Sequence, residues 1–270
     1  MNPVVGVIGA GRMGTPIIGH LVRKGFSTYA FDANAGKRAG AIAQGAQWAG
    51  TPAALAAACD VILVCVGFDR EVQELLAADG ALRQAKGGTI IAILSTIHPL
   101  TVQRLAAEAK PAGLHVVDST VCRGGEAADQ GTLLSFVGGS GDVVARLTPV
   151  LRAYSADVVH TGDVGTAQVA KAVNNLILWA CLVADHEGLA LAQHYGVDVE
   201  ALRKSLLISS CTNGPLEKWG TQTMAWAEDD MAIVAEMAAE AGIALPQAGV
   251  NREICRALKP KRYKLELYGR

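Results

Sequence analysis

The stretch "VVGVIGAGRMG", residues 4–14, decides the fold of this 270-residue chain. It begins with a continuous apolar run, which is typical of a strand that is covered on both faces of a parallel sheet. A glycine turn follows, and a helical pattern then runs through Leu21 and Val22 and stops at Gly25. Pro16 falls in the first turn of that helix, where a missing N–H is tolerated. The stretch therefore predicts a strand, a tight turn and a helix in direct succession.

The three glycines of this turn, Gly9, Gly11 and Gly14, have the spacing GxGxxG. The first permits the tight turn, the second lets a pyrophosphate approach the backbone, and the third lets the helix pack close to the strand. The N–H groups that begin the helix would then face the phosphates. Between a strand and a helix, this motif predicts a dinucleotide site that includes Arg12 and Met13. A glycine-rich turn without a ligand and a methyltransferase with a similar loop are the alternatives.

An acidic residue, Asp32, follows the second expected strand, "STYAF" (27–31), and lies 18 residues after Gly14. A carboxylate at that place accepts hydrogen bonds from a ribose diol and repels a 2′-phosphate, which favours NAD over NADP. Lys37 and Arg38 lie close downstream and soften that preference. The expected cofactor is therefore NAD, with NADP as the alternative.

The rest of the chain divides into two parts with different patterns. Further strands are expected at 61–66, 88–95, 114–119, 133–139 and 156–162, with Ala-rich helical stretches between them. Strands that alternate with helices predict an α/β fold with a parallel, doubly wound sheet, that is, a Rossmann domain over 1–162. The second domain, 163–270, has a helical pattern and is expected to be all-helical. Its pattern breaks at Gly196, near Asn213–Pro215 and at Gly242–Pro246.

The composition excludes several classes of protein. Charged residues make up 18% of the chain and the net charge is -1, so no field attracts nucleic acid or a membrane surface. The six cysteines are scattered without ligand spacing, so neither a zinc site nor a disulfide framework is expected. The most apolar stretch, 172–192, contains Asn174, Asp185 and Glu187, which favours a buried helix over a membrane span. A cytoplasmic protein without a metal is the resulting expectation.

The segment "GTAQVAKAVNN", residues 165–175, places a lysine and two asparagines on one predicted helix. Lys171, Asn174 and Asn175 share a face, because residues three and four apart are neighbours on a helix. The surrounding residues are apolar, so the ammonium is expected to be partly shielded from water. Reduction of a carbonyl by hydride needs a proton donor at the oxygen, and the reverse reaction needs a base, so Lys171 is the candidate for both roles. A lysine that snorkels at the helix edge is the alternative.

Together these stretches resemble the β-hydroxyacid dehydrogenase family, which includes 3-hydroxyisobutyrate dehydrogenases and has 6-phosphogluconate dehydrogenases as relatives. The family's GxGxMG is matched by "GAGRMG" (9–14), and its catalytic segment GxxxxxKxxNN by residues 165–175. Its substrate loop, DxPVSGGxxxAxxGTL, is matched without a gap by "DSTVCRGGEAADQGTL" (118–133). The family's "STxSP" resembles "STIHP" (95–99), and its KDLxLA helix resembles residues 228–246 more weakly.

The resemblance implies a Rossmann domain followed by a helical domain, with the active site between them. It implies that Lys171 is the catalytic lysine and that Asn175 acts with it by forming a hydrogen bond to the substrate. Ser95 and Thr96 would lie beside the nicotinamide. The implied activity is NAD(P)-dependent interconversion of a small hydroxy acid and its semialdehyde or keto form. Members of the family are commonly dimers or tetramers that assemble through the helical domain, so a homodimer or homotetramer is the expected assembly.

The substrate loop departs from the family pattern at the residues that would hold a carboxylate. The family's Ser-Gly-Gly reads Cys122-Arg123-Gly124 here, and the lysine of its Lys-Asp pair is replaced by Asp229. A thiol is a poor hydrogen-bond donor, so Cys122 alone would bind an anionic substrate more weakly than the family's serine does. One hypothesis is that Arg123 takes over carboxylate binding with its guanidinium fork.

Several alternatives stay open. Arg123 can instead form a surface ion pair with Glu126 or Asp129. The substrate can be something other than a carboxylic acid, with Cys122 lining a more apolar pocket, or Cys122 can be a covalent nucleophile. For the whole protein, the alternatives are an imine reductase of related architecture and a dinucleotide-binding protein without catalytic activity.

Overall fold

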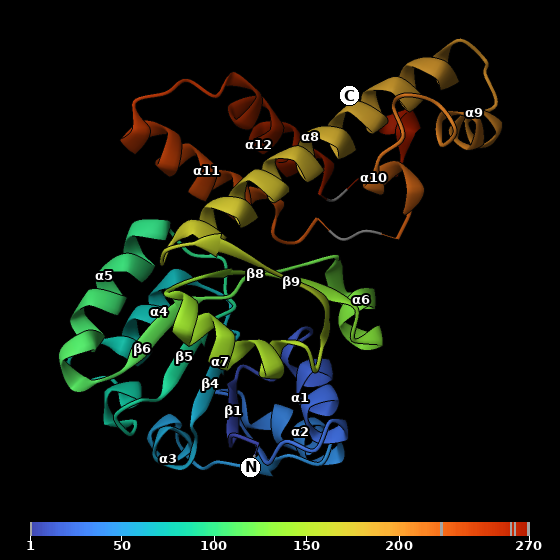
Figure 1. The fold of residues 1–270 in the computed structure, drawn as a ribbon. Coiled ribbons are helices and arrows are strands. Elements are labelled where there is room, and N and C mark those ends of the chain that lie inside the picture. The colour runs from blue at the N-terminus through green and yellow to red at the C-terminus, as the bar shows by residue number, and fades with distance from the viewer. Residues whose placement is uncertain (1, 222–223, 260, 262, 269–270) are drawn as a thin grey trace. The chain divides into compact units, whose positions relative to one another are not determined.

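The computed structural model describes residues 2–221, 224–259, 261 and 263–268. The chain divides into two compact units, Met1–Lys171 and Ala172–Arg270, and Figure 1 labels their elements. The division falls within the long helix α8 (Thr166–His194), nine residues after the boundary that the sequence predicts at 162.

One sheet forms the centre of the first unit, and its strand order is β3-β2-β1-β4-β5-β6-β8-β7, with β9 paired to β8. The first six strands in the chain run parallel in the order 3-2-1-4-5-6, which is that of a doubly wound nucleotide-binding sheet. The predicted α/β Rossmann domain is thus confirmed. The described strands are β1 (Val5–Ile8), β2 (Thr28–Phe31), β3 (Gln47–Trp48), β4 (Val61–Val64), β5 (Ile90–Ile93), β6 (His115–Asp118), β7 (Val121–Cys122), β8 (Leu133–Gly138) and β9 (Ser155–Gly162).

The sheet is not parallel throughout, which corrects the expectation of an all-parallel sheet. Strand β8 runs antiparallel to both β6 and β7, while β9 pairs parallel with β8. The two-residue strands β3 and β7 are not predicted from the sequence, because segments that short carry no readable period. The substrate loop (118–133) therefore contains a strand of the sheet, β7, before its helix begins.

Helices cover both faces of this sheet (Figure 1). One face is covered by α1 (Gly14–Arg23), α2 (Arg38–Ala43), α6 (Gly124–Gln130) and α7 (Gly141–Leu151). The other is covered by α3 (Pro52–Ala58), α4 (Asp69–Leu76) and α5 (Pro99–Ala109). Every residue of β1, β4 and β5 is buried, which explains why these strands are continuous apolar runs in the sequence. The 3-10 turns η1 (Ala35–Lys37), η2 (Ala81–Gln84) and η3 (Lys110–Ala112) complete the unit.

The regular structure described in the second unit is helical, as predicted. After α8 come α9 (Val199–Leu206), α10 (Gly214–Glu217), α11 (Ala227–Ala241), α12 (Pro246–Leu258) and the 3-10 turn η4 (Leu265–Leu267). The predicted break at Gly242–Pro246 is real: Gly242 ends α11 in the left-handed conformation, and Pro246 begins α12. Trp179 and Met231 belong to the apolar core of this unit.

Helix α8 is less buried than the sequence predicts. Among the described helices it alone is long and apolar enough to cross a membrane by length and composition, a test that core helices of soluble proteins also pass. Trp179 and Leu182 lie in the core of the second unit, whereas Val173, Ile177 and Leu191 are more than half exposed. The expectation of a buried helix is corrected: within one chain, α8 buries one face and leaves the other open.

Candidate active site

The glycine turn between β1 and α1 lies where the strand order reverses, between β1 and β4. Gly9 has a φ of +97°, and a Cβ on it would lie 2.1 Å from the carbonyl oxygen of Cys65. A Cβ on Gly14 would lie 1.8 Å from the carbonyl oxygen of Gly9. A Cβ on Gly11 would meet no described atom within 4 Å. The turn is therefore tightly packed at its two ends and open at its centre, at the place where doubly wound sheets bind their ligands.

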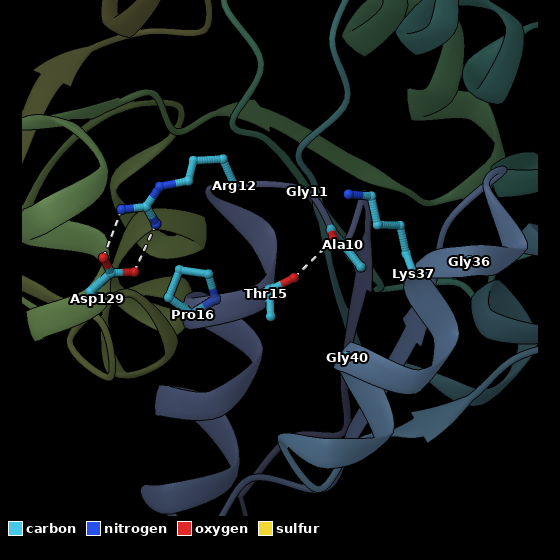
Figure 2. Close-up of a pocket in the computed structure, with 9 residues that line it drawn as sticks. All are labelled: Ala10, Gly11, Arg12, Thr15, Pro16, Gly36, Lys37, Gly40 and Asp129. Carbon is cyan, nitrogen blue, oxygen red and sulfur yellow. Dashed lines mark hydrogen bonds and ion pairs between the residues drawn. The ribbon is translucent and has the colours of Figure 1, made fainter. Parts of the chain in front are cut away.

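A pocket of about 500 Å³ opens beside this turn. Figure 2 shows the side chain of Arg12 on one side of it and that of Lys37 on the other. Two cations beside open backbone suit a ligand that carries phosphates. The residues that line the pocket are Ala10, Gly11, Arg12, Thr15, Pro16, Gly36, Lys37, Gly40 and Asp129.

Asp32 follows the end of β2, where the sequence predicts a ribose ligand. Its Oδ2 accepts a hydrogen bond from the backbone N–H of Ala10 at 2.8 Å, and its Oδ1 accepts one from Asn34 at 2.8 Å. Each carboxylate oxygen keeps a second lone pair for a ribose hydroxyl. With the open backbone at Gly11 and the cations of the pocket, these residues fit a nicotinamide dinucleotide.

Arg12 and Met13, both predicted at the cofactor, have different surroundings. The Nη1 and Nη2 atoms of Arg12 donate to the two carboxylate oxygens of Asp129 at 2.7 and 2.6 Å (Figure 2). This hydrogen-bonded pairing lowers the pKa of Asp129 and joins the glycine turn to α6 of the substrate loop. Met13 packs against the apolar core. Met13 therefore supports the turn from the protein side, while Arg12 lines the pocket.

The start of the substrate loop lies against the first turns of α8. The carboxylate of Asp118 is fully buried, and it accepts hydrogen bonds from the N–H groups of Gly165 at 2.8 Å and Gln168 at 2.9 Å. Burial raises the pKa of this carboxyl, although the hydrogen bonds from the backbone oppose the effect. Thr120 Oγ1 donates to the carbonyl oxygen of Ala167 at 3.0 Å. These contacts hold the loop on the helix that carries the candidate lysine.

Lys171 is half-buried on α8 and touches the substrate loop directly. Its Nζ donates to the carbonyl oxygen of Val121 at 2.7 Å and lies 3.9 Å from the sulfur of Cys122. Asn174 and Asn175 follow about one turn later in α8, and Asn174 Nδ2 donates to Asn175 Oδ1 at 3.0 Å. The structure thus brings together Lys171 and the loop whose sequence matches the family's substrate loop.

Arg123 has partners that the sequence does not suggest. Its φ is +83°, which is uncommon for a residue other than glycine. Its Nη2 donates to Asp157 Oδ2 at 2.6 Å, and its Nη1 donates to the carbonyl oxygen of Thr132 at 3.1 Å. Both side chains of this ion pair are about half exposed. The arrangement favours the hypothesis of a surface ion pair, with Asp157 of β9 as the partner in place of Glu126 or Asp129.

Arg123→Ala is therefore expected to change the KM for small acids by less than about fivefold, because an exposed ion pair contributes only about 0–1 kcal/mol and the guanidinium is already engaged. Steady-state kinetics on several acids measures this. Asp157→Asn is the matched control, since it releases the guanidinium without removing it. A rise in KM of more than about tenfold in Arg123→Ala alone would instead assign carboxylate binding to Arg123.

The loop after β5, residues 95–97, is held at the same end of the sheet. Ser95 Oγ accepts from the N–H of Val66 at 3.0 Å and donates to the carbonyl oxygen of Val66 at 2.9 Å. Its hydroxyl proton is thus used within the protein, while the neighbouring Thr96 is half-buried. The carboxamide of Gln168 also binds this loop, through the carbonyl oxygen of Ser95 and the N–H of Ile97. Sequence reasoning did not single out Gln168, Asp118 or Thr120.

Comparison with known proteins gives matches over both units. The model for the NAD binding domain of 6-phosphogluconate dehydrogenase matches residues 4–162, and that for the NAD-binding domain of NADP-dependent 3-hydroxyisobutyrate dehydrogenase matches 165–265. The chain is 30% identical over 262 residues to the 2-(hydroxymethyl)glutarate dehydrogenase of Eubacterium barkeri, which covers 93% of this chain and 87% of that protein.

Solved structures share the fold. The 3-hydroxyisobutyrate dehydrogenase of Mycobacterium tuberculosis, solved with L-serine, superposes with a TM-score of 0.88 at 23% identity, over 97% of this chain and 95% of that one. An imine reductase variant from Myxococcus stipitatus, solved with NAD+, gives a TM-score of 0.71 at 20% identity, over 97% and 96% of the two chains. At these identities the likeness is one of fold alone.

A doubly wound sheet with an open glycine turn at its switch point, followed by a helical unit, is the architecture of a dinucleotide-binding protein. The chain belongs to the β-hydroxyacid dehydrogenase family. It is therefore an NAD(P)-dependent dehydrogenase that acts on a hydroxyl group, and the predicted class of enzyme and cofactor is confirmed at this level.

Proposed function

We propose that this enzyme interconverts a small hydroxy acid and its semialdehyde or keto form, prefers NAD, and uses Lys171 as general acid and base. One observation carries the proposal. The ammonium of Lys171 lies 2.7 Å from the carbonyl oxygen of Val121 and 3.9 Å from the sulfur of Cys122, so it contacts the substrate loop directly. A candidate acid–base group must lie within hydrogen-bond reach of the substrate, and this placement supports that requirement.

Each residue at the proposed site has a separate role in cofactor binding or in proton transfer. Bound NAD(P) takes up or supplies the hydride. Gly11 and Arg12 would hold the diphosphate, and Asp32 would hold the ribose. In the direction of reduction, Lys171 donates a proton to the substrate oxygen, and in oxidation it removes that proton. Between turnovers the Val121 carbonyl accepts a hydrogen bond from Nζ and keeps the ammonium directed at the loop.

Binding of the substrate is proposed for the loop segment Cys122-Arg123-Gly124. The role that the family resemblance implies for Asn175 stays a prediction. Because Arg123 is paired with Asp157, its backbone rather than its guanidinium is the more suitable contact. Asp229, which stands where the family pattern has a lysine, is exposed in the first turn of α11. With the Arg123 guanidinium engaged by Asp157, a small acid with one carboxylate suits the loop better than a diacid.

The preference for NAD rests on the charge of Asp32, which would repel the 2′-phosphate of NADP. Its two hydrogen bonds from Ala10 and Asn34 hold the carboxylate at the end of β2. Lys37 lines the pocket beside the glycine turn and is the group that would accept a 2′-phosphate, so NADP stays the alternative. Rates with the two cofactors measure the balance.

The proposed activity is tested with the purified enzyme, NAD+ or NADP+, and a panel of small 2- and 3-hydroxy acids with neutral alcohols of similar size. The reverse direction uses NADH with semialdehydes and, for the imine reductase alternative, cyclic imines. Turnover of at least one hydroxy acid, faster with NAD+, is the expected result. Reduction of imines alone would favour the imine reductase, and binding of NADH with no turnover would favour the non-catalytic alternative.

We also propose that the enzyme is a homo-oligomer that assembles through α8. Val173, Ile177 and Leu191 are 51%, 58% and 61% exposed, and their spacing places them on one face of the helix. Exposed apolar side chains on one face of a helix are typical of an interface between subunits. The mass in solution, measured by light scattering, checks this, and a monomer would contradict it. A cytoplasmic location stays a prediction.

A further inference from the structure

Gln168 is a buried polar residue that the proposed chemistry does not use, and it is only 1% exposed. Its Nε2 donates to the carbonyl oxygen of Ser95 at 2.8 Å, and its Oε1 accepts from the N–H of Ile97 at 3.0 Å. The carboxamide thus pairs with the backbone on either side of Thr96, in the way that a neighbouring strand would.

The main chain of Gln168 makes a second link. Its N–H donates to Asp118 Oδ2 at 2.9 Å, so the residue joins the 95–97 loop, through its side chain, to the start of the substrate loop. Lys171 follows three residues later in α8, and residues three apart are neighbours on a helix. Lys171 in turn donates to Val121 in the substrate loop. All of these contacts lie within the first unit.

We infer that Gln168 is a positioning residue that holds the 95–97 loop, and with it Thr96, in a fixed arrangement relative to Lys171. The inference rests on the proposed function, which gives Lys171 its role as acid and base, and on the family resemblance, which implies that Thr96 lies beside the nicotinamide. Proton and hydride must reach the same bound substrate, and a misplacement of about 1 Å in such a site lowers the rate by about 100-fold. A residue that brackets Thr96 and precedes Lys171 by less than one turn is suited to prevent that misplacement.

The backbone of the loop fixes which end of the carboxamide faces which residue. The carbonyl of Ser95 needs a donor and the N–H of Ile97 needs an acceptor, and an amide supplies both. An ionised carboxylate supplies only the acceptor and would repel the carbonyl, whereas a protonated carboxyl supplies both again. Gln168→Glu therefore converts the contact into one that depends on pH.

Other titratable groups stand on the elements that pack at this place. Asp118 accepts from the backbone N–H of Gln168, and Lys171 lies on the same helix. Asp69 of α4 accepts from the N–H of His98, at the start of α5. Because these groups are shared by all the variants, each pH profile is read as a ratio to that of the wild type.

The experiment compares three variants by hydrogen exchange of the 95–97 amides without cofactor, and by kcat from pH 5.5 to 8.5. At pH 8, Gln168→Glu is expected to exchange faster in this loop and to lose about 100-fold in kcat. Both defects should shrink by at least about tenfold at pH 5.5, as the introduced carboxyl gains its proton. Gln168→Met should show both defects at every pH. Gln103→Glu is the matched control, because Gln103 is exposed and its side chain donates to the Val164 carbonyl, and it should behave as the wild type does.

Two results would overturn the inference: loop exchange that Gln168→Glu leaves unchanged, or loop protection that returns at low pH without any return of kcat. The exchange measurement needs no substrate, so it separates this inference from the proposed function. If the wild type turns over no member of the panel, the proposed function fails, and the exchange data alone decide whether Gln168 holds the loop. If Gln168→Met does not fold, the pH response of Gln168→Glu still gives the answer.

Discussion

Lys171→Met is expected to lower kcat by about 100- to 10,000-fold, the range that general acid–base catalysis supplies. Methionine keeps the apolar stem and much of the volume of lysine but can neither give nor take a proton. The Kd for NADH should change by less than about twofold, because Lys171, on α8, donates to Val121 of the substrate loop, while the residues proposed to hold the dinucleotide are Gly11, Arg12 and Asp32. Steady-state kinetics and a fluorescence titration with NADH measure the two quantities.

Lys171→Arg sharpens this test. A guanidinium keeps the positive charge and can still donate to the Val121 carbonyl, but it does not release its proton at any ordinary pH. If the ammonium serves only to hold the loop or an anionic substrate, Lys171→Arg should retain activity. If it transfers a proton, both variants should be inactive. Lys204→Met serves as the control, since Lys204 is exposed on α9. A Lys171→Met enzyme with more than about a tenth of the wild-type kcat would remove Lys171 from the proposed mechanism.

The parts of the fold that the sequence predicts well are those in which one local rule applies. Strands β1, β4 and β5 are buried on both faces, so their sequence is a plain apolar run. The glycine turn is equally local, because Gly14 is required by the carbonyl oxygen of Gly9 and Gly9 by that of Cys65, just after the neighbouring strand. The direction of β8 has no such signal. Its direction depends on how β7 and α6 connect it to β6, and no pattern in the connecting sequence predicts that direction.

The candidate site shows the same limit more clearly. Lys171 could be singled out because its neighbours in the sequence are also its neighbours on the helix. The partners of the other polar groups lie far along the chain: 34 residues separate Arg123 from Asp157, and 73 separate Gln168 from Ser95. A surface arginine has many carboxylates to choose from, so the nearby Glu126 and Asp129 were reasonable but incomplete candidates. For Gln168 a weak signal existed, since it is a lone amide among Ala167, Val169 and Ala170.

Gly14→Ala is expected to lower the melting temperature by about 10 °C. A Cβ on Gly14 would lie 1.8 Å from the carbonyl oxygen of Gly9, so α1 would have to move away from β1. That movement would disturb Ile17, Ile18 and Leu21, which are fully buried against the sheet. Overpacking of a core costs about 1–3 kcal/mol, and occasionally more, and each kcal/mol shifts the melting temperature of a chain of this size by about 2–4 °C. Thermal unfolding without cofactor measures the change.

Gly11→Ala adds the same methyl group two residues after Gly9, and it is expected to weaken NADH binding without lowering the melting temperature. Its Cβ would meet no described atom within 4 Å, so the melting temperature without cofactor should stay within about 1 °C of the wild type. The methyl would instead stand where the diphosphate approaches the backbone, so the Kd for NADH should rise at least about tenfold. Because the two substitutions are chemically identical, the contrast separates packing from ligand binding. Unchanged NADH binding in Gly11→Ala would show that the diphosphate does not use this turn, and an unchanged melting temperature in Gly14→Ala would show that α1 is not packed so closely on β1.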